Sequence, residues 1–156
     1  MRIEGYAVCL PADIDTDTII AGRYLRTKDH SVWTRHVFED LAPDIAARLE
    51  GAIIVAGKNF GCGSSREQAP IALKEAGVRG IIAPSFARIF FRNAINIGLP
   101  LAEADMPCRE GDAVVMDFSS GKVSIPGVSR DIRPLSPRMI EILRAGGLVP
   151  LWRQKR

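Results

Sequence analysis

The residues that decide the fold are Gly51-Ala52-Ile53-Ile54-Val55-Ala56-Gly57 and the eight that follow, Lys58-Asn59-Phe60-Gly61-Cys62-Gly63-Ser64-Ser65. The first seven form an apolar run between two glycines. This run is too short for a buried helix and rich in β-branched side chains, so it predicts a buried strand. The next eight predict a turn, after which Ser64 or Ser65 is suited to cap a helix over Arg66–Ala76.

The alternation of strand and helix continues on both sides of this unit. Upstream, Tyr6–Leu10 is a short apolar run that predicts another strand. Downstream, Arg79–Ala83 predicts a strand, Pro84-Ser85 opens a helix over Phe86–Ala94, and Ile95–Leu101 predicts a third strand. Such an order indicates an α/β fold whose mixed, partly parallel sheet is flanked by helices and joined by right-handed crossovers.

The remaining elements follow from weaker patterns. Two short helices are expected early in the chain, one over Ser31–Phe38 that Ser31 caps and one over Pro43–Leu49. Asp112–Phe118 and Lys122–Ile125, separated by a Ser-Ser-Gly turn, predict a hairpin. A closing helix is expected to start at Ser136-Pro137 and to end at two glycines.

Length and composition limit the classes of protein that fit. The 156 residues suffice for one compact domain with a real core, so we expect a single domain over 1–156. A chain that is 47% hydrophobic and 25% charged is neither collagen-like nor disordered. The longest apolar stretch, Ile81–Leu101, is interrupted by Arg88, Arg92 and Asn93 and is unsuited to a bilayer. Because the first residues lack the apolar core of a signal peptide, we expect a cytoplasmic protein.

The charges do not predict a nucleic-acid partner. Lysine and arginine exceed aspartate and glutamate by three, 21 against 18. Three of the basic residues, Arg153, Lys155 and Arg156, lie in the last four positions and are most simply a solubilising terminus. The rest of the chain is nearly neutral, and no aromatic residues are interleaved with basic ones as base stacking would need.

The cysteines and histidines show no ligand spacing. Cys9, Cys62 and Cys108 are odd in number, widely separated and without a Cys-x-x-Cys pair. This pattern argues against a disulfide framework and against a metal or iron–sulfur site held by this chain alone. His30 and His36 lie six residues apart and are interpreted as structural residues.

The serine turn has the features of an anion site. Gly61 and Gly63 permit close backbone approach, and a helix that begins after such a turn attracts negative charge. Ser64, Ser65 and Arg66 add two hydroxyls and a guanidinium fork that suit a carboxylate or phosphate. The dinucleotide, P-loop and nucleophile-elbow motifs are all incomplete here. A simple helix cap is the structural alternative.

Longer runs of sequence resemble a known family. The segments GKNFGCGSSREQAP (57–70) and SFARIFFRNAINIGL (85–99) are similar to the small subunits of the aconitase-family isomerases, which comprise 3-isopropylmalate dehydratase and homoaconitase. DIDTDTII (13–20) and AGGL (145–148) resemble the same family, so the resemblance covers nearly the whole chain.

The resemblance implies a fold and a reaction. The fold is a swivelling β/β/α domain of the aconitase C-terminal type, which closes over a large subunit. That partner would carry a [4Fe–4S] cluster on its own cysteines, and this chain would hold no metal. The reaction moves a hydroxyl between adjacent carbons of a hydroxy acid by dehydration to a cis-enoic acid and rehydration.

The resemblance also implies roles for individual residues. By position in the Gly-Ser-Ser-Arg-Glu motif, Ser64 corresponds to the general base that takes the carbon-bound proton. Ser65 and Arg66 correspond to residues that bind a substrate carboxylate, and Asp17 falls where a supporting group is expected. Arg88 and Arg92, four positions apart on the second helix, are interpreted from their spacing as arginines that face solvent or the partner, with a position of one of them in the cleft as the alternative.

The substrate depends on the segment Tyr24-Leu25-Arg26-Thr27, which the resemblance places beside the variable side chain of the substrate. The first expectation is isomerisation of 2-isopropylmalate in leucine synthesis, with Arg26 folding its stem over a methyl group. Alternatively, Arg26 pairs with the extra carboxylate of homocitrate, with Thr27 in support, or the enzyme accepts both substrates. From another class, the chain is a non-catalytic module that binds anionic metabolites.

Overall fold

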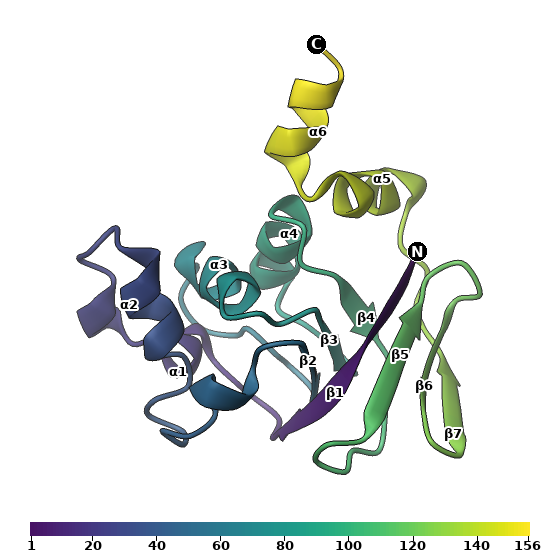
Figure 1. Ribbon diagram of the computed structural model, residues 1–156, viewed down its shortest axis with the longest axis horizontal. Coiled ribbons are helices and arrows are strands. Elements are labelled where there is room, and N and C mark those ends of the chain that lie inside the picture. Colours follow the sequence, from purple (N-terminus) through teal and green to yellow (C-terminus); the bar gives the residue numbers. More distant parts are fainter.

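The computed structural model describes all residues, 1–156, and contains one mixed seven-stranded sheet with helices on one side (Figure 1). The strand order is β4-β3-β2-β1-β5-β6-β7. The strands are β1 (Arg2–Leu10), β2 (Ala52–Ala56), β3 (Gly80–Ala83), β4 (Leu101–Glu103), β5 (Ala113–Asp117), β6 (Lys122–Ile125) and β7 (Val128–Asp131). Strands β1 to β4 pair in parallel, whereas β5, β6 and β7 join them antiparallel. The mixed α/β architecture expected from the sequence is therefore confirmed.

Six α-helices and two short 3₁₀ turns connect the strands. The helices are α1 (Thr16–Ile19), α2 (His30–Arg35), α3 (Gln68–Glu75), α4 (Arg88–Asn96), α5 (Pro137–Ala145) and α6 (Leu148–Gln154). The 3₁₀ turns are η1 (Gly22–Tyr24) and η2 (Ala46–Arg48). No helix combines the length and the apolar character needed to cross a membrane.

Two apolar clusters fill the two sides of the sheet. The larger lies between the parallel strands and the helices, where Ile54, Ile81 and Phe60 are fully buried. The smaller cluster lies on the opposite side of the same strands, where it contains Ile53 and Ile82, and it also includes side chains of β5 and β6. Because successive side chains of a strand point to opposite faces, the continuous apolar run of β2 supplies both clusters at once.

Several predicted boundaries are wrong in their details. The helix expected over Pro43–Leu49 is only the turn η2, although its Asp44–Arg48 ion pair forms at 3.6 Å. Helix α2 is capped by the Asp29 carboxylate rather than by Ser31. The strand expected over Ile95–Leu101 is wrong except at Leu101, where β4 begins, because α4 continues through Asn96. The closing helix, with its Ser136 cap, and the hairpin are confirmed.

Neither serine of the turn caps a helix, contrary to the sequence prediction. Helix α3 starts at Gln68, and Glu67 precedes it without a side-chain hydrogen bond to the helix. The reason is Pro70, which has no N–H to donate to the carbonyl of Arg66, so the regular helix cannot extend back over that residue. Ser64 and Ser65 therefore stand free of the helix and are exposed.

The expectation that the cysteines form no disulfide framework missed one disulfide. Cys9 and Cys108 form a disulfide, with Cα atoms 5.9 Å apart, between the end of β1 and the loop before β5. Since the two cysteines lie 99 positions apart, their spacing gave no sign of this pairing. Cys62 is the free cysteine.

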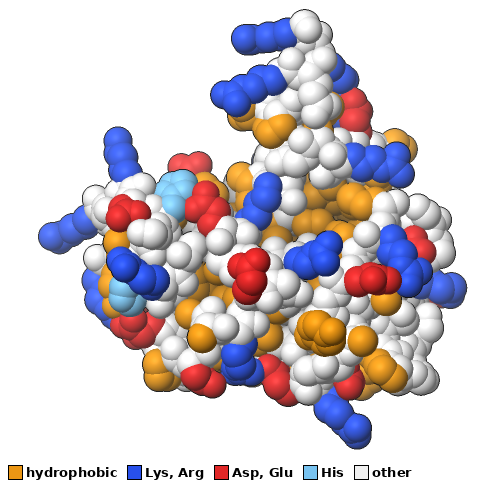
Figure 2. Space-filling view, in the orientation of Figure 1, with side chains coloured by type: hydrophobic (Ala, Val, Ile, Leu, Met, Phe, Trp, Pro, Cys, Tyr) orange, Lys and Arg blue, Asp and Glu red, His pale blue; other side chains and the backbone are white.

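The C-terminal helix α6 projects from the body of the molecule (Figure 1). Lys and Arg side chains extend from this projection, whereas acidic and basic side chains are interspersed over the remainder of the face drawn in Figure 2. On α6 the side chains of Val149 and Trp152 are also exposed.

Candidate functional site

The serine turn and the start of α4 enclose a pocket of about 290 Å³. Its lining comes from three parts of the chain, namely the start of α1, the turn after β2 and the first turns of α4. The eleven lining residues are Thr16, Gly61, Gly63, Ser64, Ser65, Arg66, Ala87, Arg88, Ile89, Phe90 and Asn93. Five of the eight site residues expected from the sequence thus meet here, and they combine hydroxyls, a guanidinium and backbone amides in one cavity.

Gly61 fits between the turn and α4 because it has no side chain. A Cβ at this position would lie 2.2 Å from Cγ of Phe90, and the backbone φ of +82° also favours glycine. The Gly61 N–H donates to the carbonyl of Ile14 at 2.7 Å, which ties the turn to the loop after β1. Close contact with Phe90 is therefore what brings the serine turn against α4.

The helix that begins at the pocket is α4 rather than α3. Ala87 precedes α4 and offers no side-chain cap. The N–H groups of Arg88, Ile89 and Phe90 donate to no backbone carbonyl. Free amides at a helix start carry partial positive charge, so the favourable field for an anion comes from the second helix of the motif.

Arg66 is held in place by the segment that contains Asp17. Its Nη1 donates to Oδ1 of Asp17 at 3.0 Å and to the carbonyl of Ile20 at 3.1 Å. The same Asp17 oxygen accepts the N–H of Gly22 at 3.2 Å. Because both bonds of Arg66 use Nη1, its Nε and Nη2 donors remain for a ligand, in the side-by-side arrangement that a carboxylate accepts.

The three acids at alternate positions have separate partners. Asp13 accepts from the side-chain amide of Asn59, Asp15 caps α1 by accepting from the N–H of Thr18, and only Asp17 contacts Arg66. The acids therefore do not form one negatively charged face.

Arg26 and Thr27 do not line the serine pocket in this chain. Arg26 is exposed on the segment between η1 and α2. The Thr27 hydroxyl accepts the N–H of Asp29 at 3.0 Å and so stabilises the start of α2. Arg88, interpreted from the sequence as a surface residue, does line the pocket.

Sequence reasoning missed five of the residues that line the pocket, namely Thr16, Ala87, Ile89, Phe90 and Asn93. Thr16 carried a usable signal, since it lies next to Asp17 within a motif already singled out. Ile89 is 53% exposed although its side chain is large and apolar, and only the fold reveals that exposure.

The histidines and Cys62 have structural surroundings. His30 pairs with Glu75 at 2.7 Å, and Nδ1 of His36 lies 2.7 Å from the carbonyl of Val32. Burial raises the pKa of the Cys62 thiol, and nearby Asp15 acts in the same direction. The thiol is therefore protonated at neutral pH and is a poor nucleophile.

No group of three or more His, Cys, Asp or Glu side chains is arranged to hold a metal ion. With Cys9 and Cys108 paired, one free cysteine remains. A [4Fe–4S] cluster needs several cysteine thiolates, so the residues of this chain do not fit one.

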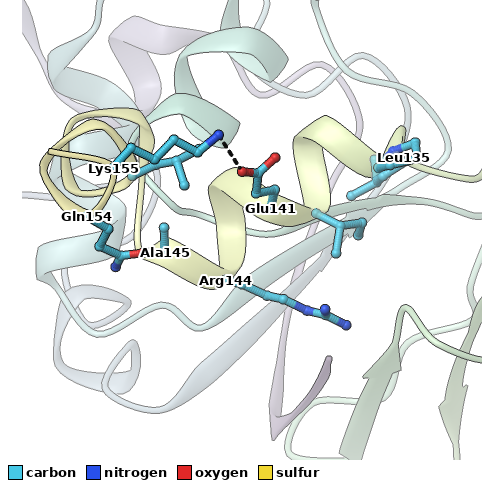
Figure 3. A pocket seen from close by; sticks show the side chains of 9 residues that line it. Leu135, Glu141, Arg144, Ala145, Gln154 and Lys155 are labelled. Atoms are coloured by element: carbon cyan, nitrogen blue, oxygen red, sulfur yellow. Dashed lines mark ion pairs between the residues drawn. The ribbon is translucent and has the colours of Figure 1, made fainter.

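A larger hollow, of about 700 Å³, lies between α5 and α6 and is far less suited to chemistry (Figure 3). Its walls include Leu135, Ala145 and the stem of Arg144, and its one ion pair joins Lys155 to Glu141 at 2.9 Å. No hydroxyl, thiol or imidazole lines it. The serine pocket is therefore the candidate site despite its smaller volume.

Comparison with known proteins agrees with this choice. Residues 12–105 match the family described as the aconitase C-terminal domain. The chain is 50% identical to the 3-isopropylmalate dehydratase small subunit of Halothermothrix orenii, over 96% of this chain and 94% of that protein. It is 53% identical to the methanogen homoaconitase small subunit of Methanothermobacter thermautotrophicus, over 88% and 82% respectively.

A solved structure shares the fold. The crystal structure of 3-isopropylmalate dehydratase from Methanocaldococcus jannaschii superposes with a TM-score of 0.93 at 42% identity, covering 99% of this chain and 95% of that one. Both the sequence and the fold therefore place the chain in one group. It belongs to the aconitase C-terminal domain family, among the small subunits of the 3-isopropylmalate dehydratase type, which are parts of hydro-lyases that work with a large subunit.

Proposed function

We propose that this chain is the small subunit of a hydro-lyase that converts 2-isopropylmalate to 3-isopropylmalate. One water leaves the substrate to give a cis-enoic acid, and one water adds back with the hydroxyl on the neighbouring carbon. The observation that carries the proposal is the serine pocket, where Ser64, Ser65 and a fixed Arg66 converge in a chain about 50% identical to subunits of that name.

In this proposal Ser64 is the general base that takes the proton from the substrate carbon. An unassisted hydroxyl is far too weak a base at neutral pH, so its alkoxide must be stabilised. The free amides at the start of α4 and the guanidinium of Arg66 both line the same pocket. The partial positive charge of these amides and the full charge of the guanidinium stabilise the negatively charged oxygen of Ser64 once water is excluded.

Ser65 and Arg66 bind a carboxylate of the substrate. The Nε and Nη2 donors of Arg66 are available for this carboxylate because Asp17 and the Ile20 carbonyl accept hydrogen bonds from Nη1 alone. Gly61 lets the turn lie close to Phe90 of α4, and the φ of +87° at Gly63 favours glycine. Asp17 thus supports binding through Arg66 rather than by contact with the substrate.

We also propose that residues 1–156 act as one swivel domain in the cytoplasm, closing over the large subunit. A [4Fe–4S] cluster held by that partner supplies the Lewis acid for the leaving hydroxyl. Closure would bring that Lewis acid to the serine pocket, whose own residues are assigned to the carboxylate and to the carbon-bound proton.

The experiment is turnover of isopropylmaleate, under anaerobic conditions, by this chain combined with its large subunit. Ser64→Ala is expected to lower kcat by at least about 1,000-fold while ligand affinity is kept, because it removes the base but not the carboxylate contacts. Ser129→Ala, which changes an exposed serine on the edge strand β7, is the matched control. Unchanged turnover in Ser64→Ala would contradict the assignment of Ser64 as the base. If the parent chain and its large subunit bind the ligand but never convert it, the result would favour a non-catalytic module that binds anionic metabolites.

Arg26 favours a second candidate, conversion of homocitrate, alone or beside isopropylmalate. Its guanidinium is exposed and could meet an extra carboxylate once the domain closes. The 53% identity to a methanogen homoaconitase small subunit is consistent with this option. Isopropylmalate is preferred because relatives named for it match at higher coverage.

A further inference from the structure

Thr16 is the one polar side chain that the fold buries, with 3% of its surface exposed. Its hydroxyl does not bond within its own helix α1. It donates instead to the carbonyl oxygen of Ser64 at 2.7 Å, across 48 positions of sequence. The Thr16 backbone N–H donates to the carbonyl of Cys62 at 2.9 Å. One residue thus holds the serine turn on both sides of Gly63.

These two hydrogen bonds fix the orientation of two peptide groups. No peptide bond in the chain is cis, so each N–H points away from the carbonyl of the same peptide. With the Ser64 carbonyl directed at Thr16, the N–H of Ser65 points the opposite way. In the same way, the Cys62 carbonyl points to the N–H of Thr16, so the N–H of Gly63 in that peptide points away from Thr16. Neither N–H donates to a backbone carbonyl.

The backbone at Gly63, between the two carbonyls that Thr16 holds, favours glycine because its φ of +87° lies in the left-handed region. A Cβ there would make ordinary contacts, 3.4 Å from Cβ of Asp15 and 3.8 Å from the Thr16 hydroxyl oxygen, so the conformation and not the space explains the glycine. The buried hydroxyl has Ser64 as its partner, and without that partner its desolvation would be uncompensated.

We propose that Thr16 is a positioning residue for Ser64. Through the Ser64 carbonyl it holds the serine backbone, and with it Oγ, in line with the carbon-bound proton, and it keeps the Ser65 N–H free to face negative charge. This inference rests on the proposed function of Ser64 as the base. Thr16 itself needs no contact with the substrate.

The test compares Thr16→Val, which replaces the hydroxyl by a methyl group, with Thr16→Ser, which keeps the hydroxyl. The matched control is Thr34→Val, because the Thr34 hydroxyl also donates to a backbone carbonyl, that of Ser31 at 3.1 Å, but in α2. All variants are assayed in the complex with the large subunit. The readouts are kcat, KM, the melting temperature of the complex, and the kinetic isotope effect with 2-isopropylmalate deuterated at the carbon that loses its proton.

Thr16→Val is expected to lower kcat by about 10- to 100-fold, since misplacing a reacting group by about 1 Å can cost about 100-fold. KM should change less than threefold, and the isotope effect should rise because proton transfer becomes more strongly rate-limiting. Thr16→Ser should recover most of kcat, and Thr34→Val should match the parent.

The results separate this inference from the function on which it rests. A kcat that stays unchanged in Thr16→Val overturns the positioning role, as does a fall in kcat with an unchanged isotope effect, because loss of folded enzyme lowers kcat without altering the chemical step. If Ser64→Ala is inactive in the same assay, the proposed function stands in either case. Turnover in Ser64→Ala would instead remove the base itself.

Discussion

Nη1 of Arg66 lies 3.0 Å from Oδ1 of Asp17, and 49 positions of sequence separate the two residues. The contact joins the serine turn to the start of α1, and the Ile20 carbonyl adds a second bond to the same nitrogen. Arg66 has 21% of its side chain exposed and Asp17 63%. An ion pair this exposed contributes little to stability, so its main effect is to fix the direction of the guanidinium, which the proposed function assigns to a substrate carboxylate.

Asp17→Ala should therefore weaken substrate binding more than it weakens the fold. Without Asp17, Arg66 keeps one bond to Ile20 and gains rotamer freedom that binding must remove, so KM is expected to rise about tenfold. The melting temperature should fall by only a few degrees, as for an exposed pair worth under about 1 kcal/mol. Steady-state kinetics of the complex measure this effect, with Asp13→Ala, whose partner is Asn59, as control. Equal KM values in the two variants would contradict the role given to Asp17.

Gly61→Ala should damage both fold and site. A methyl group at Gly61 meets the ring of Phe90 at 2.2–2.7 Å, and neither the backbone nor α4 can move without loosening the pocket. Gly111 has nearly the same φ, +85° against +82°, but open space around it, so Gly111→Ala carries the backbone cost alone. Urea unfolding should show Gly61→Ala less stable than Gly111→Ala by about 1–3 kcal/mol. Equal losses would mean that φ, and not contact with Phe90, explains the glycine.

The sequence predicted those parts of the fold that depend on local pattern. The apolar run that became β2 needed only its β-branched content, and the helix α5 needed only Ser136, Pro137 and two glycines. The predicted bounds of an element are wrong where its pairing with residues distant in sequence determines them. Strand β1 begins at Arg2, well before the apolar run, because β5 pairs with its first half. Nothing near Arg2 in sequence reveals that partner.

The candidate site shows the same division. Ser64, Ser65 and Arg66 were recognisable because their types and order suit an anion. The contacts that orient them come from Asp17 and Thr16, which lie nearly fifty positions away and meet the turn only after β1 and β2 pair. The turn pattern also predicts that the helix start facing the site is that of α3, whereas α3 begins only at Gln68 and the helix that begins at the pocket is α4.

Stability in acid should depend on Arg23. A hydrogen bond from Arg23 lowers the pKa of Asp40, and hydrogen bonds from Tyr24 and then Arg23 lower the pKa of Glu39. Since both folded pKa values lie below the ordinary values of 3.8 and 4.5, the unfolded chain binds more protons in this range. These groups therefore stabilise the fold above about pH 5, and that stability is lost as pH falls through the folded values.

Arg23→Gln should consequently lower the melting temperature at pH 7, and the difference from the parent should shrink as pH falls to 3. Arg133→Gln serves as a control because Arg133 pairs with the carboxylate of Glu103 at 3.4 Å and contacts neither Glu39 nor Asp40. Melting curves at half-unit steps of pH between 3 and 7 measure both variants. A difference that grows toward low pH would reverse the sign derived from the pKa shifts.

The substrate preference should depend on Arg26. Its guanidinium is exposed between η1 and α2, on a segment that does not line the serine pocket, so the proposed contact with substrate requires the proposed closure over the large subunit. An arginine that reads an extra carboxylate makes a charge-assisted pair, and its loss leaves that carboxylate without a partner. For Arg26→Val we expect kcat/KM for cis-homoaconitate to fall about 100-fold, while kcat/KM for isopropylmaleate stays within about threefold of the parent. Arg35→Val, which changes an exposed arginine at the end of α2, should alter neither of the two kcat/KM values.

If kcat/KM falls equally for both substrates in Arg26→Val, Arg26 contributes to closure rather than to recognition. If neither changes, the pocket around Ile89 must set the preference, and the homocitrate candidate loses the observation that favours it.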